Sequence, residues 1–171
     1  MGPYCGEKVF QTNRPITTNA HTIKIIFVSD YSVAKNGFKI RFYQNPCGGY
    51  ETNIDGVITS PNYPNEYPGL VECAWSVRLP ENYHINFTVV HKDIELWHNC
   101  QYDSLVIRNG LRQSSPILTK ICGSSNNAET VITGTNYALV RFHTDNTAHQ
   151  KGFKLLYHGV PFGRYCGGSF H

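Results

Sequence analysis

The sequence predicts an all-β protein with the architecture of a β-sandwich. Aromatic residues make up 13% of its 171 residues, and 11 of them are tyrosines, which favour strands. The 15 glycines and 9 prolines provide the turns that many short strands require. Apolar residues alternate with polar ones at a period of two, and no helical periodicity extends beyond one turn. Short strands at this spacing are typical of a sandwich.

The strand candidates follow one another with turn residues between them. The first candidate, residues 57–59, precedes a loop rich in proline and asparagine (60–69), which cannot be helical. The third candidate, residues 84–91, places Ile85, Phe87 and Val89 on one face. The fourth candidate, residues 105–108, stops at the turn dipeptide Asn109–Gly110. The candidates are residues 57–59, 73–79, 84–91, 105–108, 137–142 and 153–157.

Composition narrows the class of function. Hydrophobic residues make up 40% of the chain, which is enough for a core, and charged residues only 16%. A net charge of +3 without a basic run argues against nucleic-acid binding. The longest dense apolar run, 23–28, is far shorter than the ~20 residues of a membrane span. The first residues lack the apolar region of a signal peptide, so we expect a piece of a longer exported protein.

A domain-scale repeat sets the expected boundaries. Residues 5–40 and 122–155 both begin with Cys-Gly, contain an alternating apolar run that ends in Asp30 or Asp145, and then reach Gly-Phe-Lys. The triplet that starts at Cys47 also recurs, at residues 166–168. We therefore expect a complete unit at 47–159, the C-terminal part of a preceding unit at 1–46, and a linker with the start of a following unit at 160–171.

Six separated cysteines, none in a C-x-x-C pair, indicate disulfides and an oxidising compartment rather than a zinc ribbon. The four in the complete unit are Cys47, Cys73, Cys100 and Cys122, and they allow three pairings. Cys5 and Cys166 are expected to be unpaired because their units are truncated. The sequon Asn86-Phe87-Thr88 predicts N-glycosylation of Asn86.

Motifs along almost the whole of 47–159 resemble the CUB domain family. They are Cys47-Gly48-Gly49, Ser60-Pro61-Asn62-Tyr63-Pro64, Tyr67-Pro68, Cys73-Ala74-Trp75, Cys100-Gln101-Tyr102-Asp103, Ile121-Cys122-Gly123, Phe142-His143-Thr144-Asp145 and Gly152-Phe153. The resemblance implies an antiparallel two-sheet, jelly-roll-like β-sandwich. It also implies Cys47–Cys73 and Cys100–Cys122 disulfides.

The direct joining of such units resembles the cubilin-like endocytic receptors, which implies a protein-binding module outside the cell or on its surface, acting in cargo uptake. In that case the membrane is reached only through the parent receptor. Two alternatives stay open. The unit could be a substrate-binding module of a secreted tolloid- or complement-type protease, or a structural spacer.

The family resemblance implies a calcium site at Glu95, Asp103 and Asp145. Calcium is a hard cation that takes 6–8 oxygen ligands, and three carboxylates suit it. Where the family has its usual motif around the third acid, this sequence has His143 to Thr147, "HTDNT". Asn146 follows Asp145 in this motif and is a further candidate ligand. The same carboxylates are expected to accept a Lys or Arg of a protein partner through charge-assisted bonds.

Further roles are expected for aromatic residues around the acids. By resemblance, Tyr63 is expected to hydrogen-bond a ligand carboxylate and to border the partner. Trp75 is expected in the core. Trp97 lies in the acidic loop, where it either packs locally or contacts a partner.

Catalysis is the less favoured interpretation of these residues. Paired carboxylates can hydrolyse glycosides, but no long cleft-forming loops accompany them. Zinc binding by His91, His98 and a cysteine would compete with a disulfide at Cys100. We therefore expect no enzyme. His98 and His143, close to the acids in sequence, are either surface residues or sensors of endosomal pH.

Overall fold

A computed structural model describes residues 23–40 and 47–163. The chain divides into two compact units, Met1–Ile40 and Arg41–His171. Within the described ranges the second unit contains ten strands, and neither unit contains a helix. These ranges accordingly offer no helix that could cross a membrane.

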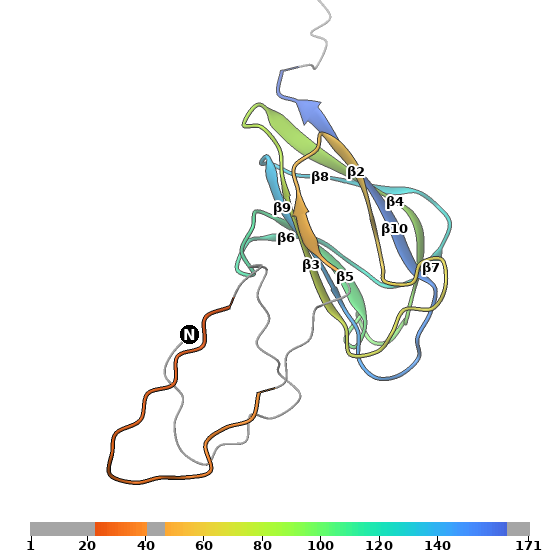
Figure 1. Ribbon diagram of the computed structural model, residues 1–171. Helices are drawn as coiled ribbons and strands as arrows, with labels where there is room; N and C mark the ends of the chain where they lie inside the picture. The colour runs from red at the N-terminus through yellow and green to blue at the C-terminus, as the bar shows by residue number, and fades with distance from the viewer. Residues whose placement is uncertain (1–22, 41–46, 164–171) are drawn as a thin grey trace, which may run out of the picture. The chain divides into compact units, whose positions relative to one another are not determined.

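The second unit is a sandwich of two five-stranded sheets, which confirms the predicted fold class (Figure 1). The first sheet has the order β1-β3-β9-β5-β6, with bounds Gly49–Glu51, Glu72–Arg78, Tyr137–His143, Ser104–Asn109 and Ile117–Ile121. The second has the order β2-β10-β4-β7, with bounds Asp55–Thr59, Gly152–Pro161, Tyr83–Ile94 and Gly123–Ser125. The strand β8 (Glu129–Ile132) also pairs with β4.

One strand pair departs from the expected antiparallel arrangement. β1 runs parallel to β3, with Gly49 opposite Trp75, whereas the other pairs between named strands are antiparallel. The Cys47–Cys73 disulfide joins the residues just before this pairing, with a Cα–Cα distance of 5.3 Å. A second disulfide, Cys100–Cys122, has a Cα–Cα distance of 5.5 Å. These are the two pairings that the family resemblance implies.

The core lies between the sheets and follows the alternation of the sequence. Phe87 in β4 is fully buried, while its neighbours Asn86 and Thr88 are only partly buried on the other face. Phe153 in β10 meets Trp75 of β3 edge-on at 6.0 Å between ring centroids. It also meets Phe142 of β9 at 5.2 Å. Trp75 is 6% exposed, which confirms its predicted place in the core.

Each of the six predicted strands is present, but four further strands were not predicted. These four, β1, β6, β7 and β8, are short, and their residues are mostly exposed or half-buried. β4 and β10 are longer than predicted and end at Ile94 and Pro161. Cys5, Cys166 and most of 160–171 lie outside the described residues.

The described part of the first unit, 23–40, forms no strand. Its Phe27 and Phe38 rings lie 5.3 Å apart between centroids. In the repeat alignment these two residues correspond to Phe142 and Phe153 of the sandwich, which make the same contact. Phe27 and Phe38 are 63% and 58% exposed, so this unit displays apolar groups that the sandwich buries.

Phe153→Ala is expected to lower the free energy of unfolding by about 3–5 kcal/mol, because it leaves a cavity among Trp75 and Phe142. Urea denaturation followed by tryptophan fluorescence measures this loss. The matched control is Val57→Ala on an exposed position, which should change stability by less than about 0.5 kcal/mol. Similar losses in both variants would contradict the assignment of the core.

Candidate metal centre

Three acidic residues meet at one end of the sandwich because three strands begin or end there. Glu95 directly follows β4, Asp103 directly precedes β5, and Asp145 lies two residues after β9. β5 and β9 are antiparallel neighbours, so the start of one lies beside the end of the other. Each acid places one carboxylate oxygen within 4.8 Å of the others.

Asp103 is the buried member of this group, at 1% exposure. Its Oδ2 accepts a hydrogen bond from the Tyr67 hydroxyl at 2.6 Å, and its Oδ1 accepts one from the Asp145 amide at 2.8 Å. The Tyr67 hydroxyl also accepts a hydrogen bond from the Glu95 amide at 3.1 Å. One tyrosine and one aspartate therefore join all three acidic positions through hydrogen bonds.

The Tyr67 phenol stays neutral at physiological pH. Its burial, and then its hydrogen bond to Asp103, raise its pKa well above the ordinary value for tyrosine. It is therefore a fixed hydrogen-bond donor to the carboxylate.

Glu95 has an electrostatic environment that suits a cation. Its Oε2 is buried and has no hydrogen-bond partner among the described residues. Burial, followed by the charges of Asp103 and Asp145, raises the pKa of Glu95. A divalent cation would offset both effects, since it would pair with Oε2 and neutralise part of the shared negative charge.

Asp145 is held by the loop that follows it. Its Oδ1 accepts hydrogen bonds from the amide of Thr147 at 2.7 Å and from the hydroxyl of Thr147 at 3.0 Å. Its carbonyl accepts a bond from the Leu70 amide at 2.7 Å. A Cβ at Gly69 would lie only 2.9 Å from that carbonyl oxygen, so glycine is required where the two loops meet.

Thr144 fixes the same two loops from the interior. Its hydroxyl accepts a hydrogen bond from the Val71 amide at 2.9 Å and donates one to the Pro68 carbonyl at 3.1 Å. The roles of Thr144 and Thr147 were not predicted from the sequence. Thr144 directly precedes Asp145, and Thr147 follows it by two residues. Since threonine often hydrogen-bonds nearby backbone groups, this spacing was the signal in the sequence for both roles. Asn146 is exposed, and its role as a ligand stays a prediction.

The expected role of Tyr63 as the hydrogen-bond partner of a site carboxylate is wrong, because Tyr67 makes that bond. The Tyr67 ring lies inside the sandwich, edge-on to Phe142 at 5.1 Å between centroids. The Tyr63 ring is only partly buried and lies against His91 at 5.5 Å. Contact between Tyr63 and a partner stays a prediction.

The loop between Glu95 and Asp103 is held by a disulfide and by a turn. Asn99 and Cys100 both adopt the left-handed conformation, with φ of 54° and 60°. Cys100 is tied to Cys122 at the end of β6, and Gln101 donates its amide hydrogen to the Trp97 carbonyl at 3.1 Å. Because Cys100 is in a disulfide, it is excluded as the cysteine ligand of a zinc site.

The same loop displays aromatic surface. Trp97 is 50% exposed, and its ring stacks on Tyr102 at 6.3 Å with 30° between the planes. His98 meets Trp97 edge-on at 5.1 Å. Leu96, next to Glu95, is 73% exposed. Trp97 therefore packs within the loop and still presents apolar surface beside the acids.

His143 does not stand free near the acids. Its Nδ1 lies 2.7 Å from Oε2 of Glu72, and Glu72 also pairs with Arg141. The hydrogen bond to Glu72 raises the pKa of His143. Burial opposes ionisation of Glu72, but the bond to His143 and the charge of Arg141 outweigh it and lower the pKa of Glu72. A sensing role for His98 or His143 stays a prediction.

Comparison with known proteins identifies relatives of the same domain. The family model for the CUB domain matches residues 47–157. Cubilin from Sus scrofa is 35% identical over 98% of this chain, and cubilin from Homo sapiens is 36% identical over 92%. Tolloid-like protein 1 from Homo sapiens is 32% identical over 90%. The chain spans only 4% of either cubilin and 15% of the tolloid-like protein.

Two solved structures are similar to this chain in sequence and in fold. The CUB2 domain of MASP-1 bound to Ca²⁺ is 31% identical, with a TM-score of 0.58 over 66% of this chain and 99% of that one. The extracellular region of zebrafish Gpr126/Adgrg6 is 30% identical, with a TM-score of 0.60 over 67% of this chain and 15% of that one.

Tyr67→Phe is expected to lower the free energy of unfolding in calcium-free buffer by about 1–3 kcal/mol, because buried Asp103 loses a donor. Chemical denaturation in the presence of a chelator measures this effect. Tyr63→Phe is the matched control and should leave stability nearly unchanged. A larger loss for Tyr63→Phe than for Tyr67→Phe would reverse the assignment.

Proposed function

The chain belongs to the CUB domain family, and on that premise we propose that residues 47–159 form a calcium-dependent protein-binding module of an extracellular, multi-CUB, cubilin-like endocytic receptor. Two disulfides within the domain fit the oxidising environment outside the cell or on its surface. The similarity to cubilins over 98% and 92% of the chain supports the receptor context.

The observation that carries the calcium assignment is the cluster of Glu95, Asp103 and Asp145, in which the buried Oε2 of Glu95 has no hydrogen-bond partner in the described part of the chain. The ligand atoms that the cluster offers are carboxylate oxygens, which calcium prefers. Asp103 would remain bonded to Tyr67 and Asp145 when metal binds, since a carboxylate accepts about four hydrogen bonds or ligand contacts. Ca²⁺ would supply positive charge that fixes the three acids in place.

The partner side chain expected at this site is a lysine or arginine. Glu95 and Asp145 are partly exposed, unlike Asp103, so they are the acids that a partner can reach. A carboxylate that ligates calcium retains lone pairs for a charge-assisted bond to such a cation. Trp97 and Leu96, in the loop next to Glu95, would contact the aliphatic part of the partner's side chain.

Several features favour binding over catalysis. Asp103 is 1% exposed and has both oxygens hydrogen-bonded, so it cannot approach a substrate as an acid or nucleophile. The remaining pair, Glu95 and Asp145, lies among exposed loop residues. These features support our proposal of a non-catalytic module.

The first unit supports a tandem array. Asp30 Oδ1 accepts hydrogen bonds from the amide and hydroxyl of Ser32, both at 2.9 Å. Asp145 and Thr147 make the same turn in the complete domain, and the Phe27–Phe38 contact matches Phe142–Phe153. We take 1–46 as the C-terminal part of a preceding CUB domain and 160–171 as the linker and start of a following one. Weak sites in tandem would bind cargo by avidity.

A second candidate function rests on the similarity to tolloid-like protein 1 at 32% identity. In a secreted protease of that kind, the same calcium-organised surface would position a substrate for a catalytic domain elsewhere in the parent protein. The flanking sequence of the parent distinguishes the two, because a receptor would continue with further CUB domains.

Calcium titration of the full chain is expected to show binding of one ion and an increase in thermal stability. At a free calcium concentration of a hundred times Kd, linkage stabilises the fold by about 2.7 kcal/mol. Asp145→Asn should abolish both effects, because it removes a charged ligand. Isothermal titration calorimetry and a thermal unfolding scan measure them.

Asp55→Asn is the matched control, since Asp55 is an exposed acid on β2 that pairs with His158. It should bind calcium as the wild type does. An equal loss of calcium binding in both variants, or a thermally silent wild type, would contradict the proposed site.

Binding of a lysine-containing peptide immobilised on a sensor surface is expected to require calcium. The response should fall to the baseline with chelator, after acetylation of the peptide lysines, and in Asp145→Asn, because each removes the charge-assisted contact. If the acetylated peptide bound as strongly as the unmodified one, a lysine of the partner would be excluded at the site.

A further inference from the structure

The second sheet carries a sequon on its outer face, far from the acidic cluster. Asn86-Phe87-Thr88 is the only Asn-X-Ser/Thr sequence, with X other than proline, in the 171 residues. It lies in the first half of β4. Since side chains alternate along a strand, Asn86 and Thr88 project to the same side, while Phe87 between them is fully buried in the core.

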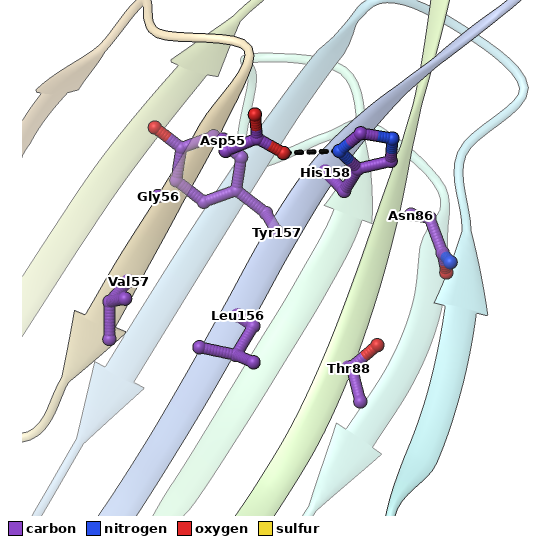
Figure 2. A pocket seen from close by; sticks show the side chains of 8 residues that line it. All are labelled: Asp55, Gly56, Val57, Asn86, Thr88, Leu156, Tyr157 and His158. Atoms are coloured by element: carbon purple, nitrogen blue, oxygen red, sulfur yellow. Dashed lines mark hydrogen bonds and ion pairs between the residues drawn. The ribbon is translucent and has the colours of Figure 1, made fainter.

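The surface around the sequon is hollowed. A depression of about 410 Å³ runs across β2, β10 and β4, and Asn86, Thr88, Val57 and Leu156 are among its lining residues (Figure 2). The strand register places Asn86 opposite His158, and Thr88 opposite Leu156, on the adjacent β10. Figure 2 shows the Asn86 and Thr88 side chains on the same face as the His158 ring, which pairs with Asp55.

This face exposes apolar side chains beside its polar ones. Val57 of β2 is 54% exposed, and Ile132 of β8, opposite Asn86, is 53% exposed. Leu156 lies between them and is partly exposed. The Oδ1 atom of Asn86 is buried and has no hydrogen-bond partner among the described residues. An apolar patch with an unsatisfied polar atom at its centre is typical of a surface that something covers.

We propose that Asn86 carries an N-linked glycan whose first sugars lie over this depression and cover Val57 and Leu156. Glycosylation forms an N-glycosidic bond between Asn86 Nδ2 and the first sugar, which is transferred from a lipid-linked oligosaccharide with release of the lipid pyrophosphate. The reaction acts on the extended chain before folding, so the central position of Asn86 in the sheet is no obstacle. After folding, the residue lies on the solvent side of β4.

The dimensions fit this arrangement. Neighbouring strands lie about 4.8 Å apart, so β2 is roughly 10 Å from β4 and within reach of the first two sugar rings. The C–H faces of the rings can contact Leu156 and Val57, while their hydroxyl groups face water. The glycan therefore removes apolar surface from water without a protein partner.

The glycan leaves the acidic cluster accessible. Asn86 precedes Glu95 by nine positions on an extended strand, which places them roughly 30 Å apart at about 3.3 Å per residue. The outer face of the second sheet is thereby closed to protein partners, and the loop end remains open to them. This inference does not depend on calcium binding, so either can fail without the other.

The test uses the full chain, secreted from animal cells behind an added export signal. Mass spectrometry of the peptide that contains Asn86 is expected to show an N-glycan, which peptide N-glycosidase removes while converting the carrier asparagine to aspartate. Asn86→Gln and Thr88→Val should lose the added mass. Thr88→Ser, which retains the sequon, should keep it. An unmodified Asn86 in the secreted wild type would overturn the proposal, and this result does not depend on the folding of any variant.

The placement of the sugars has its own measurement. Hydroxyl-radical footprinting should give several-fold less oxidation of Val57 and Leu156 in the glycosylated chain than in the enzymatically deglycosylated chain. Leu70 is the internal control, because it is 71% exposed next to the Asp145 loop and should be oxidised equally in both. Equal oxidation of Val57 and Leu156 in the two forms would show that the glycan points away from the sheet and would overturn its proposed position.

Discussion

The hydrogen bonds of the buried Asp103 carboxylate organise the functional end of this protein. Asp103 accepts from Tyr67 on one oxygen and from the Asp145 amide on the other, and Tyr67 in turn accepts from the Glu95 amide. A carboxylate that is 1% exposed is stable only when such donors surround it. The burial of one acid therefore fixes where the other two lie, and the strands that carry them are joined at this point.

Loops that would otherwise be mobile are held to this centre from several sides. The Cys100–Cys122 disulfide restrains the loop before Asp103, and the Thr144 hydroxyl joins the loop after β9 to Pro68 and Val71. Such a site requires little reorganisation when a cation arrives, which favours tight binding. The pKa of Glu95 is raised by burial and by its two acidic neighbours, which supports the proposal that a cation binds here.

The two functional surfaces proposed here occupy different parts of the same sandwich. The acidic cluster is at the ends of β4 and β9, where loops can vary without disturbing the core. The sequon is in the first half of β4, on a face that the core does not use. Because the side chains of β4 alternate, the same strand buries Phe87 and presents Asn86 to solvent.

The sequence was sufficient for the sandwich and the inward position of Trp75, because alternation is a local signal. The three acids were expected from the family resemblance, and the fold brings them together. The sequence did not identify Tyr67 as the hydrogen-bond partner of Asp103. Two tyrosines lie four residues apart in one loop, and only the folded loop shows which one packs on Phe142 and reaches Asp103. The edge strands β6 and β8 were missed because their half-exposed residues carry little alternation. Backbone contacts such as that of Gly69 with Asp145 depend on the meeting of distant loops.

The most direct test of a preformed calcium centre is an amide NMR titration of the full chain with calcium. We predict chemical-shift changes concentrated at Glu95, Asp103, Asp145 and their loops, while the strand amides of the core keep their positions. Shifts spread over the whole sandwich would contradict a site built in advance of the metal. No shifts at these three residues would contradict the site itself.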